Sequence, residues 1–280
     1  MPGCTKNSLL PLHLLKRHPI SMEAHFEFVL VLTYAFPKSV LIPLLPPGLV
    51  LDCFEDFGFL AIAFVQTRGM RPRHLPSFLG QDFFLAGHRI FVRYQTHAGR
   101  NLRGLRILRS DADRANMVFF GNLLTHYAYH LCRAKVTRTS DKLDLVIKSD
   151  DGRSDVQLTA DLSTTPPDYL PDGSPFATIR DALKFAGPLP FTFDYEEETS
   201  SIVRIEGVRQ NWHPRSVKVD VQRAAFIEQE PFRSNNPKLC SAFYHEDVPY
   251  YWKQGIAEQV REESHQAHET AEEGAFDECE

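Results

Sequence analysis

The sequence predicts an α+β domain of mainly antiparallel strands, in which one sheet curls or closes and carries two or three short helices. Segments rich in β-branched and aromatic residues recur along the chain, as is typical of buried strands. Proline, glycine and aspartate separate these segments, which indicates turns and loops. Phenylalanine is abundant (21 residues) and tryptophan is scarce (2), which favours large apolar packing inside a β-rich body.

The strands are predicted from apolar runs that end at turn residues. Residues 55–58 and the pair Asp151-Gly152 predict hairpin turns between successive strands. Several runs alternate between apolar and polar residues, which predicts strands with one solvated face. The predicted strands are residues 25–36, 49–54, 58–67, 88–97, 102–110, 127–136, 143–148, 156–162, 191–195, 202–210, 216–226 and 240–245.

Helix signals are few and short. Pro37 opens a helical turn that Pro46-Pro47-Gly48 closes. A second helix is predicted to end at Leu124. A third follows Ser174-Pro175 and stops before Gly187-Pro188, because proline and glycine interrupt helices.

Composition excludes several classes of function. The formal net charge of −5 argues against a nucleic-acid partner, because phosphate binding rests on a basic surface. No stretch reaches the roughly 18 apolar residues of a membrane span, so we expect no membrane partner. The five cysteines are far apart and include no C-x-x-C pair, which predicts reduced thiols in a cytoplasmic protein. The N-terminal apolar patch precedes its charges, the reverse of a signal peptide.

Arginine is the basic residue of the central part of the chain. Between Lys38 and Lys135 there are eleven arginines and no lysine. Arginine presents a planar fork of donors that suits a carboxylate or phosphate, so some of these residues could line an anion pocket. The alternative, favoured for most of them, is a set of solvated strand-face residues that pair with acidic neighbours. We expect residues 83–136 to form the functional wall of the protein.

The remaining motifs do not define a catalytic or metal site. His126 and His130 are four residues apart, but the glutamate of H-E-x-x-H is missing, and a strand would separate the two rings. The chain contains neither G-x-S-x-G nor a phosphate loop nor G-x-G-x-x-G. We therefore expect no metal and no cofactor.

Four blocks of sequence carry a resemblance to a known family: LLPPGLVLDCFEDFGFLAIAF, HRIFVRYQTHAGRNLRGLRILRSDADRANMVFFGNLLTHYAYHLCRAKV, PFATIRDALKFAGPLP and IEGVRQNWHP. They resemble the uncharacterised YqjF-like family of the acetoacetate-decarboxylase-like superfamily. The likeness extends over residues 26–251 and implies a curled β-cone that encloses a small-molecule pocket. We therefore expect an N-terminal extension (1–20) and an acetoacetate-decarboxylase-like β domain (21–253), and the acidic composition of residues 254–280 predicts a disordered tail.

The resemblance also implies where the catalytic residues of the superfamily would lie. Its decarboxylases use a Schiff-base lysine with a second lysine beside it. These positions fall at, or within a residue of, Tyr129 and His130, neither of which forms an imine. Arg89 lies nearest to the position of a family glutamate. The resemblance therefore implies the fold and the pocket without the Schiff-base chemistry.

Five residues are the candidates for the pocket wall: Arg93, Tyr127, Tyr129, His130 and Arg133. In a strand, Tyr127, Tyr129 and Arg133 share one face, whereas His130 lies on the other. We favour the first set, which combines aromatic surface with an anion-binding fork. Tyrosines packed in a β core are an equally good interpretation.

Three functions remain open. The first is a protein that binds a small acidic or carbonyl-containing molecule through Arg93 or Arg133. The second is an enzyme of different chemistry on a keto or carboxylate substrate, with His130 as its general acid or base. The third is a structural or partner-binding protein whose cone is filled by its own side chains. A homo-oligomer is compatible with all three.

Overall fold

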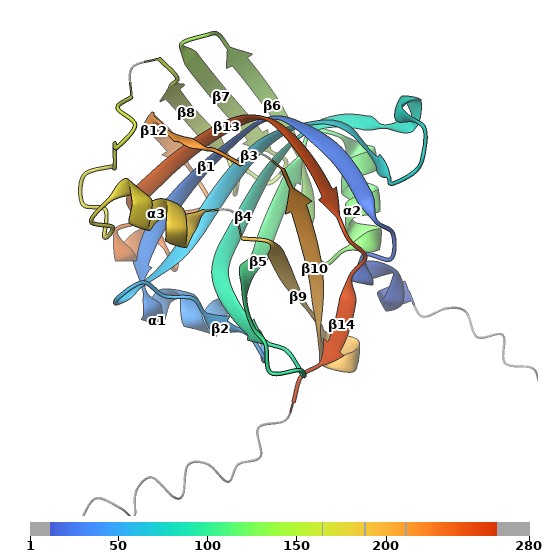
Figure 1. Ribbon diagram of the computed structural model, residues 1–280. Coiled ribbons are helices and arrows are strands. Elements are labelled where there is room, and N and C mark those ends of the chain that lie inside the picture. Colours follow the sequence, from blue (N-terminus) through green and yellow to red (C-terminus); the bar gives the residue numbers. More distant parts are fainter. Residues whose placement is uncertain (1–11, 164, 188, 211, 262–280) are drawn as a thin grey trace, which may run out of the picture.

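A computed structural model of the chain describes residues 12–163, 165–187, 189–210 and 212–261. Its strands form one sheet that closes on itself, because β4 and β5 pair in addition to the linear strand order. In Figure 1 the strands of this ring wrap around a common interior. The ring consists of β1 (Met22–Pro37), β3 (Phe57–Pro72), β4 (Gln81–Gln95), β5 (Asn101–Ala112), β9 (Phe191–Glu196), β10 (Ser201–Arg209) and β13 (Lys238–Trp252).

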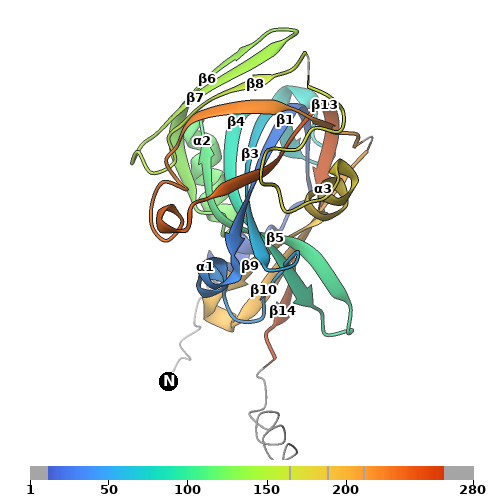
Figure 2. The same ribbon diagram turned by 90° about the vertical axis from the view of Figure 1, so that its left-hand side faces the viewer.

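A second group of strands leaves the ring at β5 and folds over its outer face. We call this group the wing. At the top of Figures 1 and 2, these strands lie across β1, β3 and β4. The wing consists of β6 (Tyr129–Arg138), β7 (Lys142–Ser149), β8 (Val156–Asp161) and β12 (Lys218–Ala224).

The two faces of β4 have different neighbours. Phe84, Ala86, Ile90 and Val92 point outward and join the main hydrophobic core, which also contains buried residues of β7 and β8. The alternate residues of β4 point into the ring. A strand covered on both faces explains why its sequence is almost continuously apolar.

The mainly antiparallel fold class predicted from the sequence is confirmed. Two pairings, β5 with β6 and β5 with β9, are parallel, and the other pairings of the ring and wing are antiparallel. Among the described residues there are three α-helices, α1 (Lys38–Leu41), α2 (Ala115–Leu124) and α3 (Ile179–Ala186). The shorter strands are β2 (Val50–Leu51), β11 (Arg215–Ser216) and β14 (Ile256–Gln259), and the 3-10 turns are η1 (Leu12–Arg17), η2 (Ile42–Leu44), η3 (Ser77–Leu79), η4 (Glu197–Thr199) and η5 (Arg233–Asn235).

Helices α2 and α3 lie on opposite sides of the ring (Figures 1 and 2). Thr178 caps α3, because its hydroxyl accepts a hydrogen bond from the backbone N–H of Asp181. Phe185 of α3 packs with Phe59 and Phe91, which closes this side of the ring with an apolar cluster. Helix α2 instead leaves Phe119 and Phe120 exposed.

The sheet continues past the domain boundary expected at residue 253. Strand β14 pairs with β10 from Ser201 to Arg204, so residues 256–259 belong to the sheet and not to a tail. The acidic composition of residues 254–280 predicted a tail, but residues 256–259 within it form a short edge strand. The rest of the predicted tail, like residues 1–11, lies outside the described residues. In the described part of the chain, no helix has the length and apolarity to cross a membrane.

Candidate functional site

A cavity of about 470 Å³ lies inside the ring. It extends from α2, through Met117 and Phe120, to the end of α3 at Ala186. Its walls are mostly apolar side chains from the inner faces of the ring strands. The described residues that line it include two arginines, Arg89 and Arg209, and no aspartate, glutamate or lysine.

Arg89 is the central charged residue of this cavity. Strand β4 places it on the inner face, in line with Leu85 and Phe91. Its Nε is buried and has no hydrogen-bond partner among the described residues, and no described carboxylate forms an ion pair with it. Burial lowers the pKa of Arg89, although the neighbouring phenols of Tyr250, Tyr129 and Tyr127 oppose this shift. Arg89 is therefore an enclosed cation without a protein counterion in the described chain.

Gly87 makes room for this guanidinium. A Cβ at Gly87 would lie 3.1 Å from both Nε and one Nη of Arg89. Contacts this short are tighter than usual, so a side chain at position 87 would require the Arg89 guanidinium to shift by a few tenths of an ångström. The sequence G-H-R thus combines a small residue and a cation on one face of the strand.

Arg209 adds a second cation from the end of β10. Its Nη2 donates a hydrogen bond to the carbonyl oxygen of Leu189 at 2.6 Å. The guanidinium lies over the rings of Trp212 and Tyr250, at 5.3 and 5.6 Å from their centroids. Burial lowers the pKa of Arg209. No ion pair joins it to any of the described carboxylates.

Tyr127 and Tyr129 both line the cavity, with ring centroids 6.4 Å apart. The hydroxyl of Tyr127 makes a 3.2 Å hydrogen bond with the hydroxyl of Thr192. The hydroxyl of Tyr129 has no hydrogen-bond partner among the described residues. Ala128, between the two tyrosines, has a left-handed φ of 47°.

Two neighbours fix the position of Tyr129. A side chain at Gly121 of α2 would overlap its ring, so the close approach of helix and strand requires glycine there. Asn122 holds the backbone of Tyr129 with two hydrogen bonds, of 2.8 and 2.9 Å. Burial raises the pKa of Tyr129 to about 12, against the opposing effect of Arg89. The phenol is therefore protonated at neutral pH and can donate a hydrogen bond into the cavity.

Arg93 is on the inner face of β4, but it does not line the cavity. It is on the same side of β4 as Arg89, beyond the Phe91–Phe185 contact that closes the cavity. There its Nε donates to Asp52 at 2.6 Å, and Arg103 donates to the other oxygen of Asp52, also at 2.6 Å. Arg93 is not among the lining residues, because the aromatic cluster separates it from them.

Arg133 is also placed away from the cavity. Strand β6 pairs with the ring only from Tyr129 to Leu131. From Cys132 onward it pairs with β7 in the wing, and the side chain of Arg133 is exposed there. Arg133 is an even number of positions after Tyr129, as the prediction required, but β6 no longer pairs with the ring at Arg133. The placement of Arg93 and Arg133 on the pocket wall is therefore wrong for this cavity.

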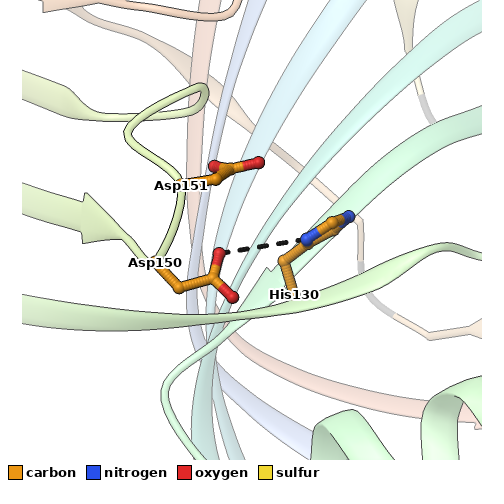
Figure 3. Close-up of side chains that lie close together, drawn as sticks. All are labelled: His130, Asp150 and Asp151. Atoms are coloured by element: carbon orange, nitrogen blue, oxygen red, sulfur yellow. Dashed lines mark ion pairs between the residues drawn. The ribbon is translucent and has the colours of Figure 1, made fainter.

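His130 lies on the outer face of the ring, next to Asp150 and Asp151 (Figure 3). Its Nδ1 is 3.9 Å from Asp150, and one ligand atom of each of the three side chains lies within 4.8 Å of the others. Both carboxylate oxygens of Asp151 already accept hydrogen bonds from Arg109, at 2.7 and 2.9 Å. These bonds hold the pKa of Asp151 well below its usual range. We interpret the group as a surface ion-pair cluster and assign no metal to it.

Four further lining residues could not be chosen from any pattern in the sequence: Arg209, Trp212, Tyr250 and Trp252. They come from β10, β13 and a loop, more than 70 residues after Tyr129. Only the closure of the ring brings them opposite β4. Arg89 could have been found, because it is a charged residue within a strand that is apolar on both faces.

Comparisons with known proteins identify the family and the fold. The model of the DUF2071 family, described as an uncharacterised conserved protein, matches residues 23–249. No curated protein sequence matches the chain. The acetoacetate decarboxylase of Legionella pneumophila has a similar structure, with a TM-score of 0.57, 13% identity, and coverage of 91% of this chain and 98% of that chain.

Two further structures share the fold. The enduracididine biosynthesis enzyme MppR complexed with pyruvate gives a TM-score of 0.56 at 12% identity, covering 90% of this chain and 92% of that chain. An acetoacetate decarboxylase-like enzyme from Sphingomonas wittichii RW1 gives 0.53 at 12% identity, covering 92% and 100% respectively. At these identities the likeness establishes the acetoacetate-decarboxylase-like fold alone.

Proposed function

The chain belongs to the DUF2071 family, and we propose that it binds a carboxylate-containing small molecule in the cavity, with Arg89 as the main anion contact. One observation carries the proposal. The Arg89 guanidinium is enclosed in a cavity whose described lining contains no acidic side chain. An enclosed charge without a counterion is costly, and a ligand carboxylate would offset that cost.

The surroundings of Arg89 suit a carboxylate. The guanidinium can donate two parallel hydrogen bonds to one carboxylate group. Tyr129 and Tyr250 add phenolic groups to the same cavity, and Arg209 adds positive charge. A ligand anion would thus meet several donors and no repelling carboxylate from the described lining.

The proposal includes no imine. The positions that the resemblance assigns to the Schiff-base pair carry Tyr129 and His130, and the described cavity lining contains no lysine. The three similar structures include two decarboxylase or decarboxylase-like proteins and one enzyme that holds pyruvate. The activities of those proteins are not assigned to this chain, but a pyruvate complex on the same fold supports a carboxylate ligand for this cavity.

An enzyme that acts on a bound keto acid or carboxylate is the second candidate. His130 lies outside the cavity, so the protonated phenol of Tyr129 takes its place as the candidate general acid. That phenol could donate a proton to an enolate held by Arg89. The cavity volume of about 470 Å³ speaks against the third hypothesis, a cone filled by its own side chains.

The test compares two ligands that differ only in their polar end. We expect octanoate to bind at least tenfold more tightly than octanamide in calorimetric titrations, because charge-assisted bonds to arginine are worth about 1.5–3 kcal/mol. Arg89→Met should abolish this preference, and Arg133→Met, at an exposed arginine of β6, should keep it. Unchanged octanoate binding by Arg89→Met would refute the proposal. Trapping of pyruvate on the protein by borohydride would refute the absence of an imine.

A further inference from the structure

The cavity is much larger than a small keto acid requires. Its volume of about 470 Å³ lies in the range of pockets that enclose drug-sized ligands, about 300–1,000 Å³. From this size, and from the arrangement of polar and apolar walls, we propose that its ligand is a long, mostly apolar carboxylate. Its head lies at Arg89 and its tail runs along β4 toward α2. This inference rests on the proposed function and specifies its ligand class.

Strand β4 shows the direction of the tail. Gln81, Phe83, Leu85, Arg89 and Phe91 of this strand all line the cavity. Arg89 is eight positions after Gln81, which is up to about 27 Å of strand at ~3.4 Å per residue. Arg89 lies next to the closed end, where Phe91 is only 2% exposed. A short acid at Arg89 would leave most of this length unfilled.

The wall between Arg89 and α2 is apolar. Apart from Thr67, Gln81 and Ser110, the residues of β1, β3, β4 and β5 that line this stretch carry apolar side chains. Such a surface gains from covering methylene groups, by about 0.8 kcal/mol for each one removed from water. Examples are Val29, Val65, Phe83, Leu85 and Ile107.

The cavity ends on the α2 side at an apolar rim. We define this rim as Ile20, Leu79 and Phe120, which line the cavity although they are 45%, 51% and 47% exposed. Three exposed apolar side chains around one opening are uncommon unless something covers them. The far end of an apolar tail would lie among them. The rim is thus the continuation of the tail site, and the ligand itself is its occupant.

The two tryptophans provide a direct measurement. The chain contains two, Trp212 and Trp252, and both line the cavity. A brominated fatty acid that enters the cavity should therefore quench most of the tryptophan fluorescence. Bromine placed along the tail reports where the tail lies, because quenching needs close contact.

The experiment titrates straight-chain carboxylates from acetate to palmitate against bromostearate quenching. We expect affinity to rise by up to about fourfold per methylene, the equivalent of ~0.8 kcal/mol, until the tail reaches the rim. Leu85→Trp, which fills the middle of the tail site, should weaken long acids at least tenfold and spare acetate and butyrate, measured by calorimetry. Leu85→Met, which conserves volume, should resemble the wild type.

The outcomes separate this inference from the proposed function. If affinity depends on Arg89 but not on chain length, the long-tail inference is overturned and the carboxylate site stands. If long acids bind equally well to wild type and Arg89→Met, the placement of the carboxylate at Arg89 and the proposed function both fail. If Leu85→Trp leaves palmitate binding unchanged, the tail does not follow β4.

Discussion

Arg89 and Arg93 lie on the same face of one strand, yet the structure treats them in opposite ways. Arg93 shares the buried carboxylate of Asp52 with Arg103, at 2.6 Å from each Nε. Arg89, four residues earlier, lies inside the cavity with no ion-pair partner among the described residues. A paired arginine and an unpaired one therefore need different physical explanations. The first is explained by stability, and the second is the basis of the ligand that we propose.

The paired region should respond strongly to loss of its carboxylate. Asp52→Ala leaves Arg93 and Arg103 without their shared counterion. We expect the free energy of unfolding to fall by about 2–3 kcal/mol. This is less than the ~3–5 kcal/mol of a fully buried pair, because the two guanidinium side chains are 42% and 28% exposed. Urea denaturation measures the change. Asp56→Ala is the control, because Asp56 pairs with Lys38 but is 98% exposed, and it should change stability by less than about 0.5 kcal/mol. Equal effects of the two substitutions would remove the distinction between buried and exposed pairs.

Replacement by methionine should change the free energy of unfolding in opposite directions at the two arginines. Arg89→Met replaces an enclosed, unpaired cation by an apolar side chain, so the ligand-free protein should gain about 1–2 kcal/mol of stability. Arg93→Met should lose about 1 kcal/mol, because Asp52 keeps only Arg103 as a partner. Denaturant unfolding of the ligand-free proteins tests both changes. A loss of stability in Arg89→Met would mean that this arginine supports the fold, and the contrast between the two positions would disappear.

Sequence reasoning reached the fold and half of the site for identifiable reasons. The apolar runs of β1, β3 and β4, with turn residues at their ends, are local features, so the antiparallel sheet could be predicted from the residues themselves. Tyr127 and Tyr129 both line the cavity, although β6 begins only at Tyr129, and their role in binding remains a prediction. Arg133 was misplaced because parity persists along a strand even after the strand changes partners, and β6 leaves the ring after Leu131.

Distance along the chain set the other limit. Arg209, Trp212 and Tyr250 join the cavity only because β10 and β13 complete the ring, and no local pattern signals that closure. Arg89 was available to sequence reasoning as the residue nearest to a family glutamate. The absence of the family glutamate was noted there, but the presence of a basic side chain in its place was not used. A charge within a strand that is almost continuously apolar is the stronger signal, although Arg93 on the same face shows that this signal alone does not mark the cavity.

The smallest expected effect separates the two tyrosines next to Arg89. Tyr129→Phe removes a hydroxyl that has no partner among the described residues, so stability should stay within about 0.5 kcal/mol of the wild type. Octanoate affinity should fall about tenfold if this hydroxyl donates to the carboxylate at Arg89, because such a bond is worth about 1.5 kcal/mol.

Tyr127→Phe is the matched control for Tyr129→Phe. Its hydroxyl already bonds to Thr192, so its loss should cost about 1 kcal/mol of stability and change octanoate affinity by less than about threefold. Calorimetric titration and urea denaturation of both variants give the two readouts. Equal affinity losses would mean that neither hydroxyl is specific to the ligand. A loss confined to Tyr127→Phe would place the carboxylate next to the Tyr127 hydroxyl and not next to that of Tyr129. The contrast between the tyrosines thus tests, at the scale of one hydrogen bond, the same rule as the contrast between the arginines: the group without a protein partner is the one that serves the ligand.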